Sequence, residues 1–460
     1  MNKYWKILPL LIGTVSALSV IRRELWFDEA LTLLNFVLPL ELGKIYFSYI
    51  IPNNQIIYSM MLKVWDWFYC GILEVTVFWR LLSLCCAVGM LAIVMMLRNK
   101  LDNGKLYPAV LVLSAMCISA GFINYATALR GYAASWLFAA GALWGLYNIF
   151  HNKTRSGWSI YITSSLLAIG TVPTNLLVLA ASWIYALPWM QKDFWRDRRF
   201  YLTAAVIPAS LIVFYAPIAQ DFLNTFKLGE GFSSRTGAAA ITLGMYVASF
   251  GLLLIFALLA IKKQPWQHCL RYLIWLMPFA AIFVLHRAPF PRVFITILPV
   301  LSMLVIDGIS GLIGENWNKF HRTMFFLTIA ASQIILIAGG AVIAHKSNLS
   351  QYEDDFFHPW YMFPDYQVSS TVKILKELPA DKSVFISFPA DPAPLLFYAA
   401  TDALQRNFLS DIPYNSVKNL APGSLLVLRS NENSADYEKR FNGKLRKLSG
   451  NRWQTVWELY

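Results

Sequence analysis

Three carboxylates lie within six positions near the N-terminus, in the stretch Arg22-Arg-Glu-Leu-Trp-Phe-Asp-Glu-Ala. Glu24, Asp28 and Glu29 are interspersed there with bulky apolar residues. Carboxylates among apolar groups at a membrane boundary are costly and are more often functional than incidental. Ends of membrane spans are also commonly polar for no catalytic reason. The pattern leaves two alternatives, a catalytic or binding role and the ordinary polarity of a span end.

Arginines recur beside aromatic and proline-rich turns farther along the chain. Arg80 lies in Phe-Trp-Arg, Arg130 lies two residues before Tyr132, and Arg287 and Arg292 bracket Ala-Pro-Phe-Pro. A guanidinium pairs with phosphate oxygens through two parallel hydrogen bonds, so arginines facing an acidic loop would form a site for an anionic lipid. Taken singly, each arginine can instead contact lipid headgroups.

The composition places these residues in a membrane protein. Apolar residues make up 57% of 460 positions and charged residues 14%, whereas soluble domains have about 45–50% and about 25%. Residues 346–460 contain 13 basic and 13 acidic residues, so the net charge of +13 lies entirely in the preceding part. A nucleic-acid-binding protein would concentrate its basic residues on a soluble face, and this class is therefore excluded.

Hydropathy predicts about eleven membrane spans, since about 20 apolar residues cross roughly 30 Å of hydrocarbon. The predicted spans are 5–21, 77–97, 106–124, 131–150, 157–171, 174–190, 200–220, 239–261, 271–286, 290–312 and 322–344. The first resembles a signal peptide but lacks a small-residue cleavage site, so we expect it to be retained. The break at Val172-Pro173-Thr174-Asn175 is either a turn between two spans or a kink in one.

Charge bias decides the orientation and favours the turn. With the N-terminus inside and eleven crossings, the inner segments contain sixteen basic residues and four acidic ones, as expected for cytoplasmic loops. The basic residues are Lys3, Lys6, Arg98, Lys100, Lys105, Lys153, Arg155, Lys192, Arg196, Arg198, Arg199, Lys262, Lys263, Arg271, Lys319 and Arg322. This orientation puts the C-terminus outside the cytoplasm, and we expect a multi-pass protein of the bacterial inner membrane.

Two outer segments are too long to be simple connections. In the loop 22–76, the amphipathic stretch 55–68 is too short to span and predicts a helix lying in the interface. In the tail, 383–388 and 425–428 read as buried strands, whereas 371–378 and 394–400 read as helices. We therefore predict a transmembrane domain over 1–345, an all-α polytopic bundle, and a small α/β extracytoplasmic domain over 346–460.

Several motifs resemble those of the GT-C membrane glycosyltransferases, which include protein O-mannosyltransferases and bacterial aminoarabinose-type transferases. Trp26-Phe-Asp-Glu-Ala followed by Pro52-Asn-Asn-Gln-Ile-Ile-Tyr-Ser resembles their first outer loop. Phe78-Trp-Arg-Leu-Leu-Ser, Ala128-Leu-Arg-Gly-Tyr-Ala and Arg292-Val-Phe-Ile-Thr-Ile-Leu-Pro resemble later landmarks, in order, to about residue 312. Gln55 is a departure because many relatives have histidine there, so any role of that histidine does not carry over.

The resemblance implies transfer of a sugar, with inversion, from a polyprenyl-phosphate donor to a lipid, glycan or protein acceptor on the outer face. It implies Asp28 as general base and Glu29 as a second catalytic carboxylate, with Glu24 beside them. Substrate binding would fall to Glu24, Asn53, Asn54, Arg80, Arg130, Tyr132, Arg287 and Arg292. No cofactor is required, and a divalent cation held by Asp28 and Glu29 is an open alternative. The donor arrives from within the bilayer, so no glycine-rich phosphate loop is needed.

Two other functions fit part of the pattern. A transporter or flippase for a lipid-linked substrate would place ionisable residues along the middle of its spans. The predicted spans are nearly free of them, with Asp307 near an inner end as the main exception. A scaffold whose outer domain binds a partner would explain the tail but not the acidic stretch.

Overall fold

A computed structural model describes most of the chain and divides it into two compact units. The described residues are 3–48, 54–152, 154–190, 194, 197–220, 234–260, 270–284, 291–313, 317–346, 367–410 and 417–460. The first unit contains Met1–Arg22 and Leu40–Ala344. The second contains Arg23–Pro39 together with the described C-terminal residues from 367 onward. Glu24, Asp28 and Glu29 therefore belong to the second unit, whereas the predicted span before them belongs to the first.

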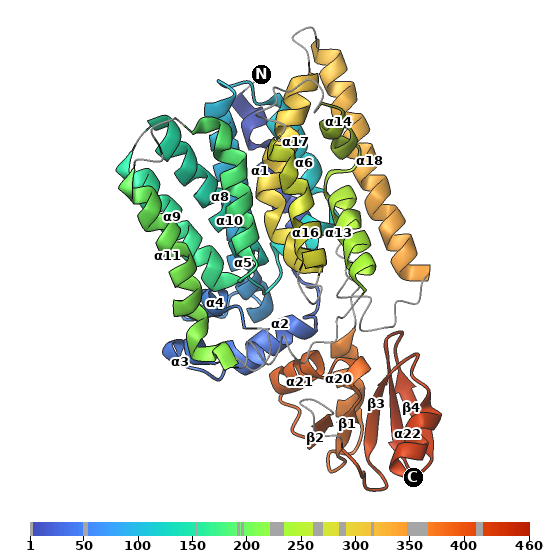
Figure 1. Ribbon diagram of the computed structural model, residues 1–460. Coiled ribbons are helices and arrows are strands. Elements are labelled where there is room, and N and C mark those ends of the chain that lie inside the picture. The colour runs from blue at the N-terminus through green and yellow to red at the C-terminus, as the bar shows by residue number, and fades with distance from the viewer. Residues whose placement is uncertain are drawn as a thin grey trace. The chain divides into compact units, whose positions relative to one another are not determined.

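The first unit is an all-α membrane bundle (Figure 1). Its α-helices are α1 (Leu8–Leu18), α3 (Leu42–Phe47), α4 (Ile56–Asp66), α5 (Val75–Leu101), α6 (Tyr107–Cys117), α7 (Ala120–Ala126), α8 (Tyr132–Tyr147), α9 (Arg155–Thr171), α10 (Asn175–Ala186), α11 (Arg198–Tyr215), α13 (Arg235–Phe250), α14 (Leu252–Leu259), α16 (Met277–Val284), α17 (Leu298–Leu312) and α18 (Lys319–Lys346). Five 3₁₀-helical segments and one π-helical segment (η3) extend these helices within the described residues: η1 (Lys3–Ile7), η3 (Asn148–Asn152), η4 (Leu187–Trp189), η6 (Ala216–Ile218), η8 (Leu270–Leu276) and η9 (Pro291–Ile297). Each of the eleven segments predicted to span the membrane has a helical counterpart.

Length and burial divide these helices into a lipid-facing rim and a buried centre. Among the described residues, five helical segments are long and apolar enough to cross a bilayer, or seven if two bent pairs each count as one span. The bends are 72° between α6 and α7 and 95° between α13 and α14. In Pro291–Leu312, 83% of the apolar window is buried, against 17% in Lys319–Val342. Apolar side chains left exposed on α18 fit contact with lipid rather than water. Eleven crossings remain a prediction.

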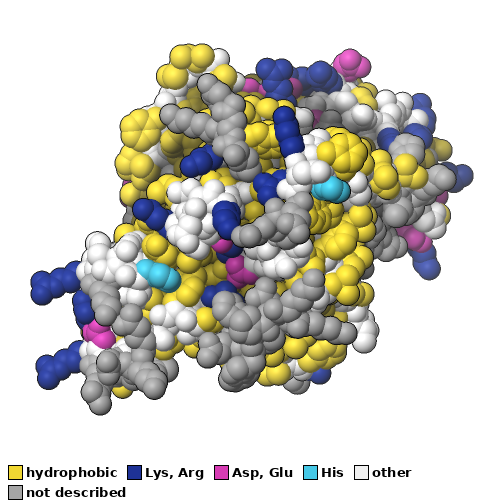
Figure 2. All heavy atoms as spheres, turned by 90° about the horizontal axis from the view of Figure 1, so that it is seen from above, with side chains coloured by type: hydrophobic (Ala, Val, Ile, Leu, Met, Phe, Trp, Pro, Cys, Tyr) yellow, Lys and Arg dark blue, Asp and Glu magenta, His cyan; other side chains and the backbone are white. Residues whose placement is uncertain are grey.

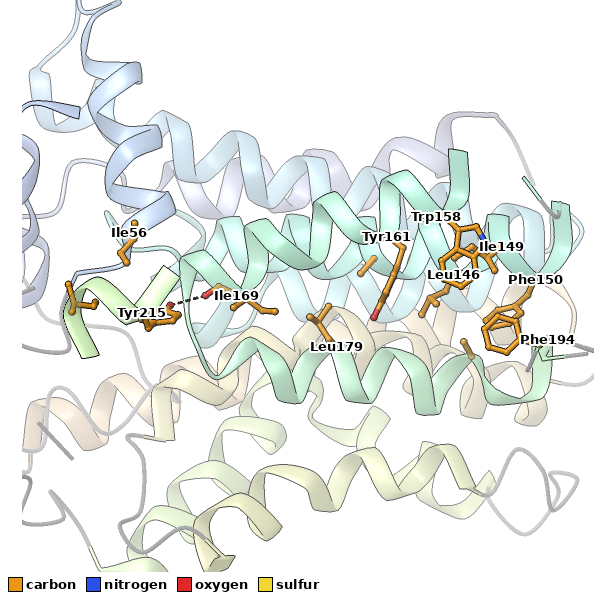
Figure 3. Packing of buried hydrophobic residues seen from close by; sticks show 13 residues of the cluster. Ile56, Leu146, Ile149, Phe150, Trp158, Tyr161, Ile169, Leu179, Phe194 and Tyr215 are labelled. Atoms are coloured by element: carbon orange, nitrogen blue, oxygen red, sulfur yellow. Dashed lines mark hydrogen bonds between the residues drawn. The ribbon is translucent and has the colours of Figure 1, made fainter. Parts of the chain in front are cut away.

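The break at Pro173 is a turn between antiparallel helices. The indole of Trp183 in α10 donates a 2.6 Å hydrogen bond to the hydroxyl of Tyr161 in α9. In one continuous helix these residues, 22 positions apart, would be separated by about 33 Å. Figure 3 shows α9 and α10 running side by side, and Tyr215 at the end of α11 bonded to the carbonyl of Ile169 at 2.8 Å. The predicted helix pair is confirmed.

Basic side chains gather at one end of the bundle. Lys6, just before α1, donates a 3.4 Å hydrogen bond to Asn99 near the end of α5, so the two helices are antiparallel. Figure 2 looks onto this end and shows basic side chains spread across it. The start of α18 lies at this end too, because Tyr107 at the start of α6 donates to the carbonyl of Arg322. It is the end that charge bias predicts to face the cytoplasm.

Four charged residues form a buried network near the same end. Arg98 pairs with Asp307 at 2.5 Å and with Asp102 at 2.7 Å. Arg271 pairs with Asp307 at 2.9 Å and lies over the ring of Tyr185, whose hydroxyl donates to Asp307 at 2.9 Å. The arginines are 2% and 5% exposed at the side chain. The network links α5, α10, η8 and α17 and neutralises charge that the interior could not otherwise hold.

The second unit is a small α/β domain built around a five-stranded sheet in the order β2-β1-β3-β5-β4. Its strands are β1 (Val384–Ile386), β2 (Phe408–Ser410), β3 (Leu425–Arg429), β4 (Leu445–Gly450) and β5 (Gln454–Leu459). Its helices are α2 (Phe27–Thr32), η2 (Leu33–Val37), α20 (Val368–Glu377), η10 (Phe388–Ala390), α21 (Pro392–Thr401) and α22 (Ser434–Phe441). The strands predicted around residues 383–388 and 425–428 and the helices around 371–378 and 394–400 are confirmed.

The pairing of the strands accounts for their apolar sequences. β1 pairs in parallel with both β2 and β3, whereas β5 is antiparallel to β3 and β4. All three residues of β1 and all five of β3 are buried. Central parallel strands are covered on both faces, so they read as continuous apolar runs rather than alternating ones. On one face, Phe385 and Leu426 pack against Phe441 at the end of α22.

Candidate functional site

Asp28 and Glu29 occupy the first turn of α2. The helix starts after Trp26, whose backbone N–H donates to the Glu29 carboxylate at 3.2 Å and whose carbonyl accepts from Ala30 N–H at 3.0 Å. The hydroxyl of Thr32 donates to the Asp28 carbonyl at 2.9 Å, one turn later. Negative side chains are favoured in the first helical turn, because the unpaired N–H groups there carry partial positive charge.

The two carboxylates differ in what they do locally. Glu29 is fully buried, and its side chain folds back to the start of its own helix. It therefore stabilises the turn that carries Asp28. Asp28 is 6% exposed, and its neighbours in the chain, Phe27 and Glu29, are buried as well. A buried aspartate in the first turn of a helix is held on a fixed backbone and can act on a proton at a defined place.

Glu24 caps a helix that lies more than 340 residues away in sequence. Its carboxylate accepts from the backbone N–H of Val368 and, at 3.0 Å, from that of Ser369. The hydroxyl of Ser369 also donates to it. These donors form the first turn of α20. Sequence reasoning assigned Glu24 to substrate binding, and nothing local in the sequence signals this capping role.

Arg80, Arg130 and Arg292 lie at the end of the first unit opposite the basic face. Arg80 is in the second turn of α5, which begins at that end because α5 is antiparallel to α1. Arg130 lies in the turn before α8, and this turn contacts α5 through Ser83. Arg292 is the second residue of η9, whose Ile295 carbonyl accepts from the Trp136 indole in the second turn of α8 at 2.8 Å.

These three arginines are buried, which separates them from arginines that contact lipid headgroups at the surface. Arg80, Arg130 and Arg292 are 0%, 3% and 7% exposed. An arginine that serves only to contact headgroups keeps its guanidinium at the surface. Arg235, at the start of α13, is exposed and fits that role. The buried three are instead suited to an enclosed anionic group.

The turn that carries Arg130 is held by three side chains. Ser83 donates to the Ala128 carbonyl at 2.6 Å and shares a 2.7 Å hydrogen bond with the hydroxyl of Tyr58. The side-chain oxygen of Gln55 accepts from the backbone N–H of Gly131. Gln55 is the residue at which the sequence departs from the motif it resembles, and here its amide oxygen holds the arginine turn. Neither Ser83 nor Tyr58 has a spacing that sequence reasoning could have used.

Gly131 is required by close packing. A Cβ atom there would lie 2.3 Å from Thr171 Cγ2, 3.0 Å from Gln55 Oε1 and 3.2 Å from Tyr58 Cβ. Real Cβ atoms essentially never approach another atom within 3.0 Å. Tyr132 follows, almost fully buried, with its ring edge-on to Tyr125 at 4.7 Å. The turn thus fixes Arg130 and Tyr132 relative to α4, α5 and α9.

Of the remaining residues predicted to bind substrate, Asn54 is among the described residues. The Asn54 amide donates to the Ile45 carbonyl at 3.0 Å and to the Ser48 carbonyl, and its oxygen accepts from Ser59 at 3.1 Å. It therefore holds α3 against α4. Asn53 and Arg287 lie outside the described residues. Within the part of the chain that is described, no cluster of three or more His, Cys, Asp or Glu side chains could hold a metal ion.

The comparisons with known proteins identify the fold. No family model matches the sequence, and no curated protein matches it significantly. The structure is similar to the crystal structure of ArnT from Cupriavidus metallidurans in the apo state, with a TM-score of 0.57. The similarity covers 99% of this chain and 97% of that one, at 12% sequence identity. The chain has the fold of ArnT. The resemblance to GT-C transferases is thereby confirmed at the level of the fold, from the membrane bundle through the C-terminal domain.

Proposed function

We propose that the protein is a glycosyltransferase that moves a sugar from a polyprenyl-phosphate donor to an acceptor hydroxyl at the outer face of the membrane. The observation that carries the proposal is an ArnT fold in which a buried aspartate, Asp28, opens the helix that follows the first span. A structural neighbour at 12% identity supplies the fold alone. The chemistry is argued from the residues.

Asp28 is the proposed general base. Its carboxylate takes the proton of the acceptor hydroxyl as that oxygen attacks the anomeric carbon. The bond from the anomeric carbon to the phosphate oxygen breaks on the opposite face, so the configuration inverts. Polyprenyl phosphate leaves with the bonding electron pair. Glu29 supports this step by closing the turn on which Asp28 lies.

Buried arginines are the proposed ligands of the departing phosphate. Negative charge grows on the phosphate oxygens in the transition state, and guanidinium groups fixed in advance stabilise it most strongly where water is excluded. Arg80, Arg130 and Arg292 are buried at one end of the bundle and fit this role. Arg287, Asn53, Asn54 and Tyr132 complete the proposed substrate-binding set. A divalent cation at Asp28 and Glu29 would be a variant of this mechanism, which loss of activity in EDTA and recovery in Mg²⁺ or Mn²⁺ would support.

The proposed orientation follows from charge. Basic residues concentrate at the end of the bundle opposite the buried arginines, as expected if that end faces the cytoplasm of a bacterial cell. The chemistry would then occur on the extracytoplasmic side of the inner membrane. The C-terminal domain would lie there too, as 346–460 in the sequence-based division.

The test compares wild type with Asp28→Asn, both purified in detergent. Release of polyprenyl phosphate is followed from a panel of lipid-linked sugars with crude envelope acceptors. We expect wild type to release it and Asp28→Asn to lose about 10²- to 10⁴-fold in rate, the usual contribution of a general base. Asp436→Asn makes the same chemical change at an exposed position of α22 and should retain full activity.

Two results would contradict the proposal in different ways. Wild-type rates in Asp28→Asn would place the base elsewhere. Tight donor binding without release by wild type, for every donor, would favour a transporter or flippase for a lipid-linked substrate.

A further inference from the structure

The start of α20 has no capping side chain of its own. The residue before the helix, Gln367, has a φ of +53° and makes no side-chain cap hydrogen bond. The first N–H groups of a helix need acceptors, and a side chain just before the helix usually supplies one. Here the acceptor is the carboxylate of Glu24, which is half-buried and bonds to the N–H groups of Val368 and Ser369. Its negative charge also suits the positive end of the helix dipole.

Two further contacts hold the residues that follow Glu24. The backbone N–H of Leu25 donates to the hydroxyl of Tyr398 in α21 at 2.9 Å. The ring of Phe27 meets the ring of Phe388 in η10 edge-on, with centroids 5.9 Å apart and planes at 75°. Residues 24, 25 and 27 are therefore each held by a different element of the C-terminal domain. Asp28 is the next residue.

We propose that the C-terminal domain positions the catalytic turn, with Glu24 and Tyr398 as positioning residues for Asp28. This inference rests on the proposed glycosyl transfer and assigns a task to the domain within that reaction. Glu24 acts through α20 rather than on the sugar. Its oxygens are directed at backbone N–H groups of a helix, which is an anchoring arrangement and not one that leaves a carboxylate presented to a sugar hydroxyl.

The position of the base matters because proton transfer depends steeply on geometry. A displacement of about 1 Å in a reacting group can cost about a hundredfold in rate. Release of Glu24 from α20 would free the chain immediately before Asp28. Substrate binding by the first unit would be unchanged. The expected signature is therefore a loss in kcat with little change in the KM for donor.

The experiment uses the full-length protein in detergent and measures two properties of each variant. The first is kcat and KM for release of polyprenyl phosphate, and the second is amide hydrogen exchange in the peptide covering residues 23–39. Glu24→Gln keeps the size of the side chain but removes its charge. Tyr398→Phe removes only the hydroxyl that accepts from Leu25. Glu438→Gln is the matched control, because Glu438 also bonds a backbone N–H in this domain, that of Leu445 at 2.7 Å, away from the acidic stretch.

We expect Glu24→Gln to lower kcat by about ten- to a hundredfold, with KM within about twofold, and to speed exchange in residues 23–39. Tyr398→Phe should show the same pattern more weakly, and Glu438→Gln should match wild type in both measurements. Faster exchange with unchanged kcat would overturn the inference. A loss of kcat with unchanged exchange would do so as well, since Glu24 would then act on substrate. If wild type cleaves no donor, the proposed function and the catalytic half of the inference both fail, and exchange alone still decides whether Glu24 holds the segment.

Discussion

Replacement of Gly131 by alanine tests whether the arginine turn is placed by packing. Gly131 has a φ of −67°, which alanine adopts without strain, so the effect of the substitution is purely steric. The new methyl carbon would lie 2.3 Å from Thr171 Cγ2, where ordinary contacts begin at 3.4 Å. The shortfall is 3.4 − 2.3 = 1.1 Å. The turn, the end of α9 or the Thr171 side chain must give way by about that distance.

The size of the effect follows from this displacement. The turn is held from the other side by Ser83, Tyr58 and Gln55, so it moves as a unit with Arg130. A shift of about 1 Å in a charge that stabilises a transition state costs about a hundredfold in rate, or about 2.7 kcal/mol. We expect Gly131→Ala to lower kcat for polyprenyl phosphate release by that factor while the protein still folds.

A second substitution separates this mechanism from a general loss of structure. Thr171→Ser removes the methyl group that the alanine would strike and keeps the hydroxyl that donates to the Leu167 carbonyl at 2.7 Å. The remaining contacts, 3.0 Å to Gln55 and 3.2 Å to Tyr58, need shifts of only a few tenths of an ångström. The double variant should therefore recover at least tenfold over Gly131→Ala. Gly339→Ala is the control, because nothing lies within 4 Å of its added methyl carbon.

Turnover and thermal unfolding in detergent would be measured for all four variants. A double variant no faster than Gly131→Ala would refute the steric reasoning. Wild-type turnover in Gly131→Ala would show that α9 or the Thr171 side chain gives way instead and that the turn tolerates the change.

Two stability predictions complete the set. Asp307→Ala should destabilise the bundle by about 3–5 kcal/mol, because it leaves Arg98 and Arg271 in the interior without the carboxylate they share. The control Asp197→Ala breaks a partly exposed pair with Arg199 and should cost about 1 kcal/mol. Equal unfolding temperatures of the two variants would contradict this account. In the C-terminal domain, hydrogen bonds from Lys382 and then Arg446 lower the pKa of Glu458 below its ordinary value of 4.5, so its contribution to stability is present above about pH 4.5 and is lost as the pH falls through the folded-state value. Amide exchange in β4 and β5 should therefore be faster in Glu458→Gln than in wild type at neutral pH and equal in strong acid, and a difference that persists in acid would refute this sign.

Hydropathy and charge predicted the helices well because both signals are local. A segment of about 20 apolar residues has few alternatives to a helix in a bilayer, where each backbone group must be satisfied internally. The break at Pro173 could be interpreted as a turn because the later basic loops fall on the inner side only if residues 157–190 form two spans rather than one. The strands β1 and β3 were predictable for a related reason, since a short, largely apolar run fits a fully buried strand.

The contacts that place the site residues could not be predicted in this way. Gln55 drew attention only as a departure from a motif, and its bond to Gly131 spans 76 residues. Asp307 was noted as an isolated charge, but its partner Arg98 is 209 residues away. The assignment of Arg23–Pro39 to the C-terminal unit depends on caps and ring contacts with no periodicity at all. Specific polar pairing over long separations leaves no mark on local composition.

The Glu24 cap has a consequence for how the protein is made. The carboxylate and the N–H group of Val368 are 344 residues apart in the chain. At about 5–20 residues per second, synthesis of that interval takes roughly 17–70 s. During this time the acidic stretch has already left the ribosome, while the helix that anchors it does not yet exist. A nascent or prematurely terminated chain therefore carries the complete acidic motif without the partner that shapes it, and the proposed activity is deferred until α20 has been synthesised.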